Sequence, residues 1–170
     1  MDGVAVAEET TSFDDFVAAR GDALWRSAWL LTGDAQLAED LVQTALAKSY
    51  GRWDRIGDAG GFEAYVRRAL FTTYVSWWRR RWNGERPTAD LPDTAAATPD
   101  LDLELRRDLL TALAELPRGQ RAVVVLRYFE DRTERDTAEV LGCSVGTVKS
   151  QAARAMATLR SSSALRQEDT

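Results

Sequence analysis

The chain has 170 residues and a net charge of −5, and apolar residues make up 45% of it, which is enough to bury one core or two small ones. It has no histidine and a single cysteine, so histidine-based catalysis, an internal disulfide and a zinc site are excluded. No segment is apolar for long enough to span a bilayer, and residues 1–12 lack the basic start and apolar centre of a secretory signal. The sequence therefore predicts a cytoplasmic protein with no cofactor and no membrane partner.

The charges are unevenly distributed along the chain. Residues 63–86 hold six basic and two acidic side chains and residues 140–170 hold four and two, whereas residues 1–62 hold five basic and eleven acidic ones. Two basic segments favour nucleic acid as a partner, but the overall negative charge opposes it. We therefore expect the chain alone to bind DNA weakly and to need a second protein that holds it there.

The middle of the chain divides it into two parts. Residues 83–100 hold three of the four prolines and show no helical spacing of apolar residues, which is typical of a linker. Both flanks show helical periodicity, and neither alternates with the period of a strand. We predict an all-α fold with two small helical domains at residues 13–83 and 101–161, a flexible linker at 84–100, and tails at 1–12 and 162–170.

The N-terminal part predicts three helices, near residues 13–31, 35–53 and 62–82. In the first, apolar residues recur every three or four positions and form one stripe. Gly33 is expected to end this helix and Asp34 to cap the next. A loop is expected before the third helix, at Gly57, Gly60 and Gly61.

The third of these helices carries an unusual mixture of side chains. Six aromatic residues lie among five arginines between residues 65 and 82. Aromatic rings stack on unpaired bases and arginines pair with phosphates, so this composition favours single-stranded nucleic acid. An ordinary core helix with a solvated basic face explains the same composition equally well.

The C-terminal part predicts a helix near residues 101–116, a second near 119–129 and a helix-turn-helix over residues 133–160. Thr133 and Ser144 are suited to cap the two helices of this motif, and Gly142 to form the turn between them. The residues expected to pack inward are Ala138, Val140, Leu141, Val145, Val148, Ala152 and Ala155.

The second helix of such a motif enters the major groove with its N-terminal residues at the base edges. The residues expected to be exposed there are small or polar, so the helix can approach DNA closely, and two of them carry positive charge. They are Ser144, Gly146, Thr147, Lys149, Ser150, Gln151 and Arg154. A plain helical hairpin is the alternative.

Three segments of the chain carry a family resemblance. AEDLVQTALAKSY at residues 38–50, FEAYVRRALFTTYVSWWRRR at residues 62–81 and the helix-turn-helix region at residues 112–155 follow one another in this order. Together they resemble extracytoplasmic-function (ECF) sigma factors of the sigma-70 family, and the actinobacterial SigE-like subfamily most of all. In that family the three segments bind the polymerase clamp, melt and read the minus-ten element, and read the minus-thirty-five element. The resemblance implies a sigma factor that directs promoter-specific initiation and is not an enzyme.

The resemblance also implies roles for particular residues. Core RNA polymerase would be bound through its beta-prime clamp, by Asp40, Leu41 and Gln43, and through its beta flap. Minus-ten promoter DNA would be contacted by Arg52, Ile56, Phe62, Ala69, Thr72, Arg79, Arg80 and Arg81. Of these, Ile56, Phe62, Ala69 and Thr72 would line a pocket for a base flipped out of the stack. Minus-thirty-five DNA would be contacted by Ser144, Thr147, Lys149, Ser150 and Arg154.

Two positions depart from the pattern of the family. Many relatives carry asparagine where Thr72 stands, and many carry arginine where Gln151 stands. A threonine offers one hydroxyl and lacks the two amide donors of asparagine. We therefore expect the preferred minus-ten base and the upstream motif to differ from those of such relatives.

The residues alone leave two other functions to consider. A stand-alone helix-turn-helix regulator with an N-terminal interaction domain would bind a palindromic site tightly without polymerase, whereas the acidic chain and the aromatic, basic helix favour a sigma factor. An enzyme would need a nucleophile with a base, a phosphate-binding glycine loop or a metal cluster, and no such pattern in the sequence supports an enzyme. The resemblance also raises an anti-sigma factor as a partner.

Overall fold

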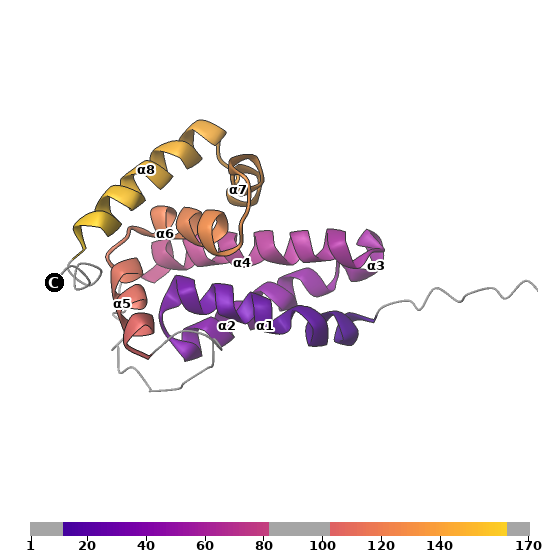
Figure 1. The fold of residues 1–170 in the computed structure, drawn as a ribbon. Coiled ribbons are helices and arrows are strands. Elements are labelled where there is room, and N and C mark those ends of the chain that lie inside the picture. Colours follow the sequence, from indigo (N-terminus) through magenta and orange to yellow (C-terminus); the bar gives the residue numbers. More distant parts are fainter. Residues whose placement is uncertain (1–11, 82–102, 163–170) are drawn as a thin grey trace, which may run out of the picture.

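The computed structural model describes residues 12–81 and 103–162, and these form helices with short connections, which confirms the all-α fold (Figure 1). The N-terminal unit consists of α1 (Phe13–Thr32), α2 (Ala35–Tyr50), α3 (Trp53–Ile56) and α4 (Ala59–Arg81). The C-terminal unit consists of α5 (Leu103–Ala114), α6 (Arg118–Val124), the π-helical turn η1 (Val125–Phe129), α7 (Glu134–Leu141) and α8 (Val145–Ser161). The predicted tails, apart from Ser12 and Ser162, and the predicted linker lie outside the described residues, as do the side chains of residues 78–81 and 103–105.

The ends of α1 and α2 follow from local side-chain chemistry. Ser12 and Asp15 form a capping box, in which each side chain accepts a hydrogen bond from the backbone of the other. Gly33 ends α1 in the left-handed region, with φ of 69°, and Asp34 accepts hydrogen bonds from Gln36 and Leu37 at 2.8 and 3.0 Å. The predicted roles of Gly33 and Asp34 are confirmed.

The region between α2 and α4 differs from the prediction. The second helix ends at Tyr50 and the short α3 follows it, so the predicted end at residue 53 is wrong. The third long helix begins at Ala59, because the carboxylate of Asp58 accepts a hydrogen bond from the Gly61 backbone at 2.6 Å and so satisfies the first turn. Gly60 and Gly61 therefore belong to the helix and not to the predicted loop.

Most of the described aromatic side chains of α4 belong to the core. Phe62, Phe71 and Tyr74 are at most 2% exposed. At the start of α4, Phe62 meets Phe13, Phe16 and Trp53 in edge-on contacts, with ring centroids 4.8 to 5.9 Å apart. These rings hold the helices of the N-terminal unit together, so the core interpretation is correct for them and they are not available to stack on bases.

The helix-turn-helix forms at the predicted residues. Thr133 accepts a hydrogen bond from the Asp136 backbone at 3.0 Å to cap α7, and Gly142 makes the turn with φ of 66°. Ala138 and Val148 pack with Val123 of α6 in a small core of their own. Val145, in the first turn of α8, is 38% exposed, so its predicted inward packing is wrong, whereas Val148, three residues later, is fully buried.

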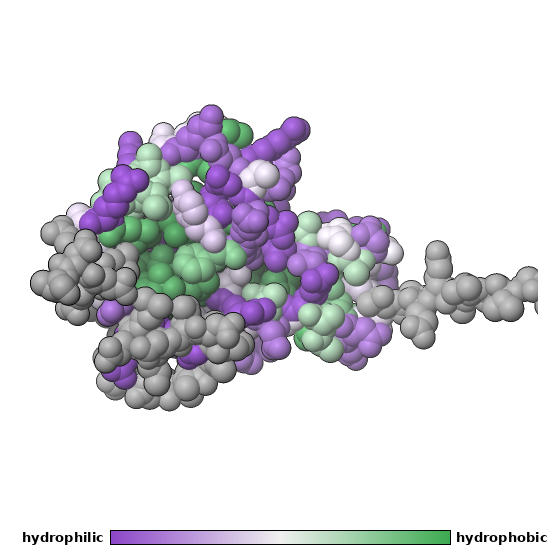
Figure 2. Space-filling view, in the orientation of Figure 1, coloured by the Kyte–Doolittle hydropathy of each residue, from purple (hydrophilic) through white to green (hydrophobic). Residues whose placement is uncertain are grey.

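The two units pack against one another, which the sequence did not predict. The C-terminal unit lies along α1 and α4, with α5 and α6 against α1 and with α6 and α7 against α4 (Figure 1). Buried apolar residues of both units form one continuous cluster that includes Leu31, Leu70, Leu116 and Leu126. Figure 2 shows apolar residues gathered around α6, between α8 and α5, while the outer surface of α7 and α8 is largely hydrophilic.

Candidate nucleic-acid interface

The N-terminal half of α8 presents a small, polar and basic surface. The hydroxyl of Ser144 caps the helix by accepting a hydrogen bond from the Thr147 backbone at 3.1 Å, and the two hydroxyls lie 2.9 Å apart. Val148 and Ala155 are fully buried against the rest of the unit. The opposite face is exposed and consists of Gly146, Thr147, Lys149, Ser150 and Arg154. The five predicted minus-thirty-five residues are therefore all exposed: Ser144 is the N-cap, and Thr147, Lys149, Ser150 and Arg154 lie within the first ten residues of α8.

The charged residues of this surface are free to meet DNA. Lys149 is 66% exposed, and its ammonium group lies 3.8 Å from Glu134, which is a weak surface ion pair. The Ser150 hydroxyl donates to the Gly146 carbonyl within the helix at 3.1 Å. A phosphate or a guanine edge would compete easily with these protein contacts, because each of the contacts is exposed to solvent and contributes little free energy.

The predicted polymerase-binding residues divide into two kinds on α2. Asp40 and Gln43 are exposed and, being three positions apart, share one face of the helix. Leu41 is 0% exposed and lies in the core of the N-terminal unit. Asp40 and Gln43 are therefore accessible to a partner, whereas Leu41 holds α2 against α1 and α4.

The predicted minus-ten residues lie in three different environments. Arg52 is exposed and its guanidinium lies 5.9 Å from the centre of the Tyr65 ring, Ile56 is half-buried beside Gly61, and Phe62 is fully buried. Ala69 is half-buried and Thr72 exposed, one turn apart on α4. The side chains of Arg79, Arg80 and Arg81 lie outside the described residues.

The structure brings Ala69 and Thr72 together and separates them from Phe62. A cavity of about 360 Å³ adjoins the start of α3, but its walls come from Ser12, Phe13, Asp14, Tyr50, Gly51, Trp53 and Asp54 and include none of the four predicted pocket residues. The Thr72 hydroxyl donates to the Arg68 carbonyl at 2.7 Å. Arg68 is exposed one turn before Thr72 on the same face of α4.

Other kinds of site are not visible in the described residues. In residues 12–81 and 103–162, no three histidine, cysteine, aspartate or glutamate side chains come together in a way that could hold a metal ion. None of the helices in these two stretches is long and apolar enough to cross a membrane. Cys143 is a half-buried free thiol in the turn before α8, where it packs against the small core of the helix-turn-helix.

Comparisons with known proteins agree with this arrangement. The family models "Sigma-70 region 2" and "Sigma-70, region 4" match residues 16–84 and 106–159. The RNA polymerase sigma-E factors of Streptomyces avermitilis and Streptomyces coelicolor are each 46% identical over 155 residues, which is 89% of this chain and 85% and 86% of theirs. The ECF RNA polymerase sigma factor SigL of Mycobacterium tuberculosis is 33% identical over 170 residues, covering 94% of this chain and 93% of that protein.

Two solved structures share the fold across both units. The sigma factor RpoE of Bartonella quintana, solved in complex with the anti-sigma factor NepR, superposes with a TM-score of 0.68 at 26% identity, over 87% of this chain and 94% of that one. CnrH, solved in complex with the cytosolic domain of CnrY, superposes with a TM-score of 0.61, also at 26% identity, over 87% and 84% of the two chains. With both sigma-70 regions matched and close relatives aligned over most of their length, the chain belongs to the ECF sigma factors of the sigma-70 family, of the SigE type.

Proposed function

We propose that this sigma factor binds core RNA polymerase through α2 and reads promoter DNA through α4 and α8. The single observation that carries the proposal is α8: a helix capped by Ser144, with a buried apolar face and an exposed polar face in its N-terminal half. That is the surface that a helix-turn-helix uses in the major groove. Residues 13–83 bind polymerase and the minus-ten element, and residues 101–161 bind the minus-thirty-five element.

The exposed residues take the direct contacts and the buried ones take supporting roles. Asp40 and Gln43 contact the polymerase clamp, while Leu41 keeps α2 in position from the core. Thr72, Ala69 and the neighbouring Arg68 contact minus-ten DNA, with Arg52 and Ile56 nearby and with Arg79 to Arg81 continuing along α4. Phe62 acts as a packing residue, because it has no exposed surface from which to touch a base.

The same proposal covers where and with what the protein acts. It acts in the cytoplasm, with polymerase and promoter DNA as partners, and it performs no catalysis itself. The two solved neighbours were determined with an anti-sigma factor and with a cytosolic domain bound. We include an anti-sigma factor among the partners of this chain on that basis.

Substitution on α8 tests the proposal with the assembled holoenzyme. Arg154→Ala should weaken promoter binding by roughly tenfold, because one contact to a base or phosphate contributes on the order of 1–3 kcal/mol. The measurement is an equilibrium titration of the holoenzyme, made with core polymerase and full-length chain, on a promoter fragment.

Arg135→Ala is the matched control. Arg135 is 86% exposed on α7 and pairs only loosely with Glu139, at 3.9 Å, so its loss removes the same charge from the same unit. If Arg154→Ala and Arg135→Ala weaken promoter binding equally, α8 is not the reading surface and the proposed assignment fails.

A further inference from the structure

Two arginines, Arg67 and Arg121, are buried in the part of the chain that the structure describes, and each is 7% exposed. Arg67 of α4 is balanced by carboxylates. Its guanidinium lies 3.3 Å from Glu63 on the same helix and donates a hydrogen bond to Glu130 at 3.0 Å. Glu130 also accepts a hydrogen bond from the Ser27 hydroxyl of α1 at 2.8 Å. The positive charge of Arg67 is therefore neutralised within a buried network.

Arg121 of α6 is buried to the same extent but has no such partner. It donates to the Leu30 carbonyl, in the last turn of α1, at 2.8 Å. Within residues 12–81 and 103–162, the ion pairs of carboxylates are made by other side chains, and one terminal nitrogen of Arg121 is buried without a hydrogen-bond partner. A guanidinium keeps its charge in proteins, and a buried charge without a counter-ion is costly. The protein thus leaves the charge of Arg121 unbalanced.

The neighbours of Arg121 supply no negative charge. Burial lowers the pKa of the Arg121 guanidinium, and burial raises the pKa of the Tyr74 hydroxyl, which is therefore protonated and neutral. Arg118 donates to the Tyr74 carbonyl at 3.1 Å, and its guanidinium carbon lies 4.7 Å from the centre of the Tyr74 ring. Arg118 therefore adds a second positive charge on the same side of α6.

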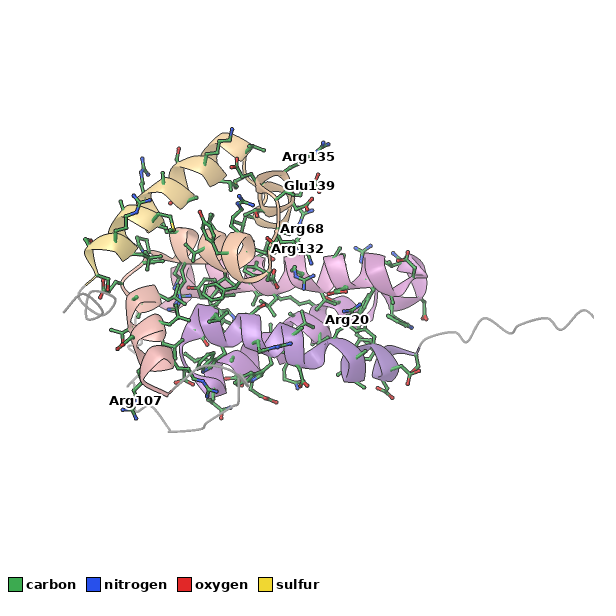
Figure 3. All side chains as sticks on the ribbon, in the orientation of Figure 1. Arg20, Arg68, Arg107, Arg132, Arg135 and Glu139 are labelled. Atoms are coloured by element: carbon green, nitrogen blue, oxygen red, sulfur yellow. The ribbon has the colours of Figure 1, made fainter. Side chains whose placement is uncertain are left out.

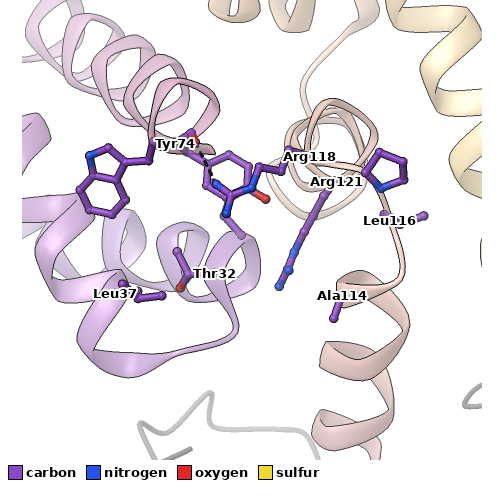
Figure 4. Close-up of a pocket in the computed structure, with 10 residues that line it drawn as sticks. Thr32, Leu37, Tyr74, Ala114, Leu116, Arg118 and Arg121 are labelled. Carbon is purple, nitrogen blue, oxygen red and sulfur yellow. Dashed lines mark hydrogen bonds between the residues drawn. The ribbon is translucent and has the colours of Figure 1, made fainter. Parts of the chain in front are cut away.

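These two arginines line a cavity of about 150 Å³ between α6, α5 and the helices of the N-terminal unit (Figure 4). Of the described residues, ten form its walls, and they include both arginines but no aspartate or glutamate. Ala114 and Pro117 are wall residues that are exposed, so solvent reaches the cavity on that side. Because one water molecule needs only about 10–15 Å³, the cavity has room for a small anion.

The chemistry of the walls favours a phosphate group. A guanidinium presents a planar fork of donors that matches the oxygens of a carboxylate or a phosphate. A carboxylate carries one negative charge, whereas a phosphate monoester carries about 1.5 to 2 at pH 7 and offers three strong acceptor oxygens. Two arginines beside one cavity are therefore balanced better by phosphate. Water would satisfy the unpaired nitrogen of Arg121 but would leave its charge unbalanced.

We propose that this cavity is a binding site for a small phosphate anion, either inorganic phosphate or the phosphate group of a small monoester, held between Arg118 and Arg121. The walls contain none of the residues assigned above to polymerase or to promoter DNA. The site is therefore a separate binding function of the chain, and it does not rest on the proposed function.

A phosphate titration of the full-length chain tests this proposal by nuclear magnetic resonance. Sodium chloride is replaced stepwise by inorganic phosphate at constant ionic strength, and the signals of the Arg121 Nε–H group and the Thr32 backbone amide are followed. Both should shift along one saturating curve. Acetate should bind at least about tenfold more weakly, because it carries a single charge. Glycerol 3-phosphate, titrated in parallel, distinguishes the two sources of the phosphate group, and saturation by either phosphate supports the site.

Arg121→Gln should weaken phosphate binding, read from the Thr32 amide, by about tenfold or more, because it removes a charge-assisted hydrogen bond to the anion. Arg135→Gln is the matched control. It removes the same charge from α7, where Arg135 is 86% exposed and lies far from α5 and α6 (Figure 3). The phosphate affinity of this control should equal that of the wild type.

A second pair of variants decides the question even if Arg121→Gln lowers the helical circular dichroism. Ala114→Glu places a carboxylate at the exposed wall of the cavity, where it competes with phosphate for the arginines and should weaken binding by about tenfold or more. Ala114→Gln adds nearly the same volume without the charge. It should retain most of the phosphate affinity, which separates the effect of charge from that of size.

Three results would overturn the proposal. Shifts that rise without saturation for both phosphates would show that the cavity holds water only. Equal affinity for acetate and phosphate would show that the site does not select a phosphate group. Binding that survives both Arg121→Gln and Ala114→Glu unchanged would place the phosphate elsewhere on the chain. Since neither polymerase nor DNA is present, none of these results bears on whether the chain acts as a sigma factor.

Discussion

At the scale of single residues, Gly33 has a left-handed backbone and also lies beside Arg121 at the contact between the two units. Its φ of 69° lies in the left-handed region, and a Cβ atom there would lie 3.5 Å from the guanidinium of Arg121. Gly21, in the middle of α1, is different: its backbone is helical, and an added Cβ would meet a Val17 methyl group at an ordinary 3.8 Å. The two glycines should therefore respond in opposite directions to the same substitution.

Gly33→Ala should destabilise the protein by about 1 kcal/mol, because alanine pays a steric penalty in the left-handed region. Gly21→Ala should stabilise it by up to about 1 kcal/mol, because alanine is the better helix former. In thermal unfolding followed by circular dichroism, the melting temperatures should move apart by several degrees, at about 2–4 °C per kcal/mol. Equal shifts in the same direction would contradict the assigned geometry.

Thr72→Asn is expected to change which base the holoenzyme prefers within the minus-ten element. Thr72 is exposed on α4 and its hydroxyl is turned back to the Arg68 carbonyl, whereas an asparagine would offer two amide donors to a base. Transcription from promoters randomised at each minus-ten position would reveal the change. Thr158→Asn, on a threonine bonded to its own helix in the same way, is the control; a preference unaltered by Thr72→Asn would mean that the base is read elsewhere.

At the scale of elements, helix ends were predictable because their causes are local. Gly33, Asp34, Thr133, Gly142 and Ser144 each act on residues within four positions along the chain. The start of α4 differs from the prediction because glycines at 60 and 61 favour a loop by residue type, whereas the Asp58 cap makes them part of the first turn. The aromatic residues of α4 were ambiguous because composition alone does not show which of them face the core.

Ser144→Ala is expected to lower the free energy of unfolding by about 1 kcal/mol, since it removes the hydrogen bond that the hydroxyl accepts from the Thr147 backbone. Ser76→Ala, at an exposed position inside α4, should have no effect or a slightly stabilising one, because alanine favours the helix interior. Urea titration of both variants compares them directly. A loss of stability in Ser76→Ala as large as in Ser144→Ala would rule out capping as the cause.

At the scale of the whole molecule, the least predictable feature is the contact between the units. Ser27 and Glu130 are 103 positions apart, and Arg67 and Glu130 are 63 apart. The sequence between them includes a segment with no periodic pattern, so nothing local indicates which faces meet. The surface of α8 was predictable for the opposite reason, because capping, turn and helical spacing fix it within residues 133–160. The candidate minus-ten residues fall between these cases: Thr72 and Phe62 were both expected to line a base pocket, and Thr72 is exposed whereas Phe62 is fully buried.

The central claim is that this chain directs promoter-specific initiation, and mapping transcript starts tests it most directly. Core RNA polymerase from a Streptomyces species, shown to be active with its own primary sigma factor, is mixed with this protein and a promoter library, and the RNA 5′ ends are sequenced. Transcript starts should cluster at a fixed distance downstream of a pair of shared motifs. Asp40→Ala should lower the number of these starts, because it weakens binding to the polymerase clamp. No clustered starts above core polymerase alone would contradict the account.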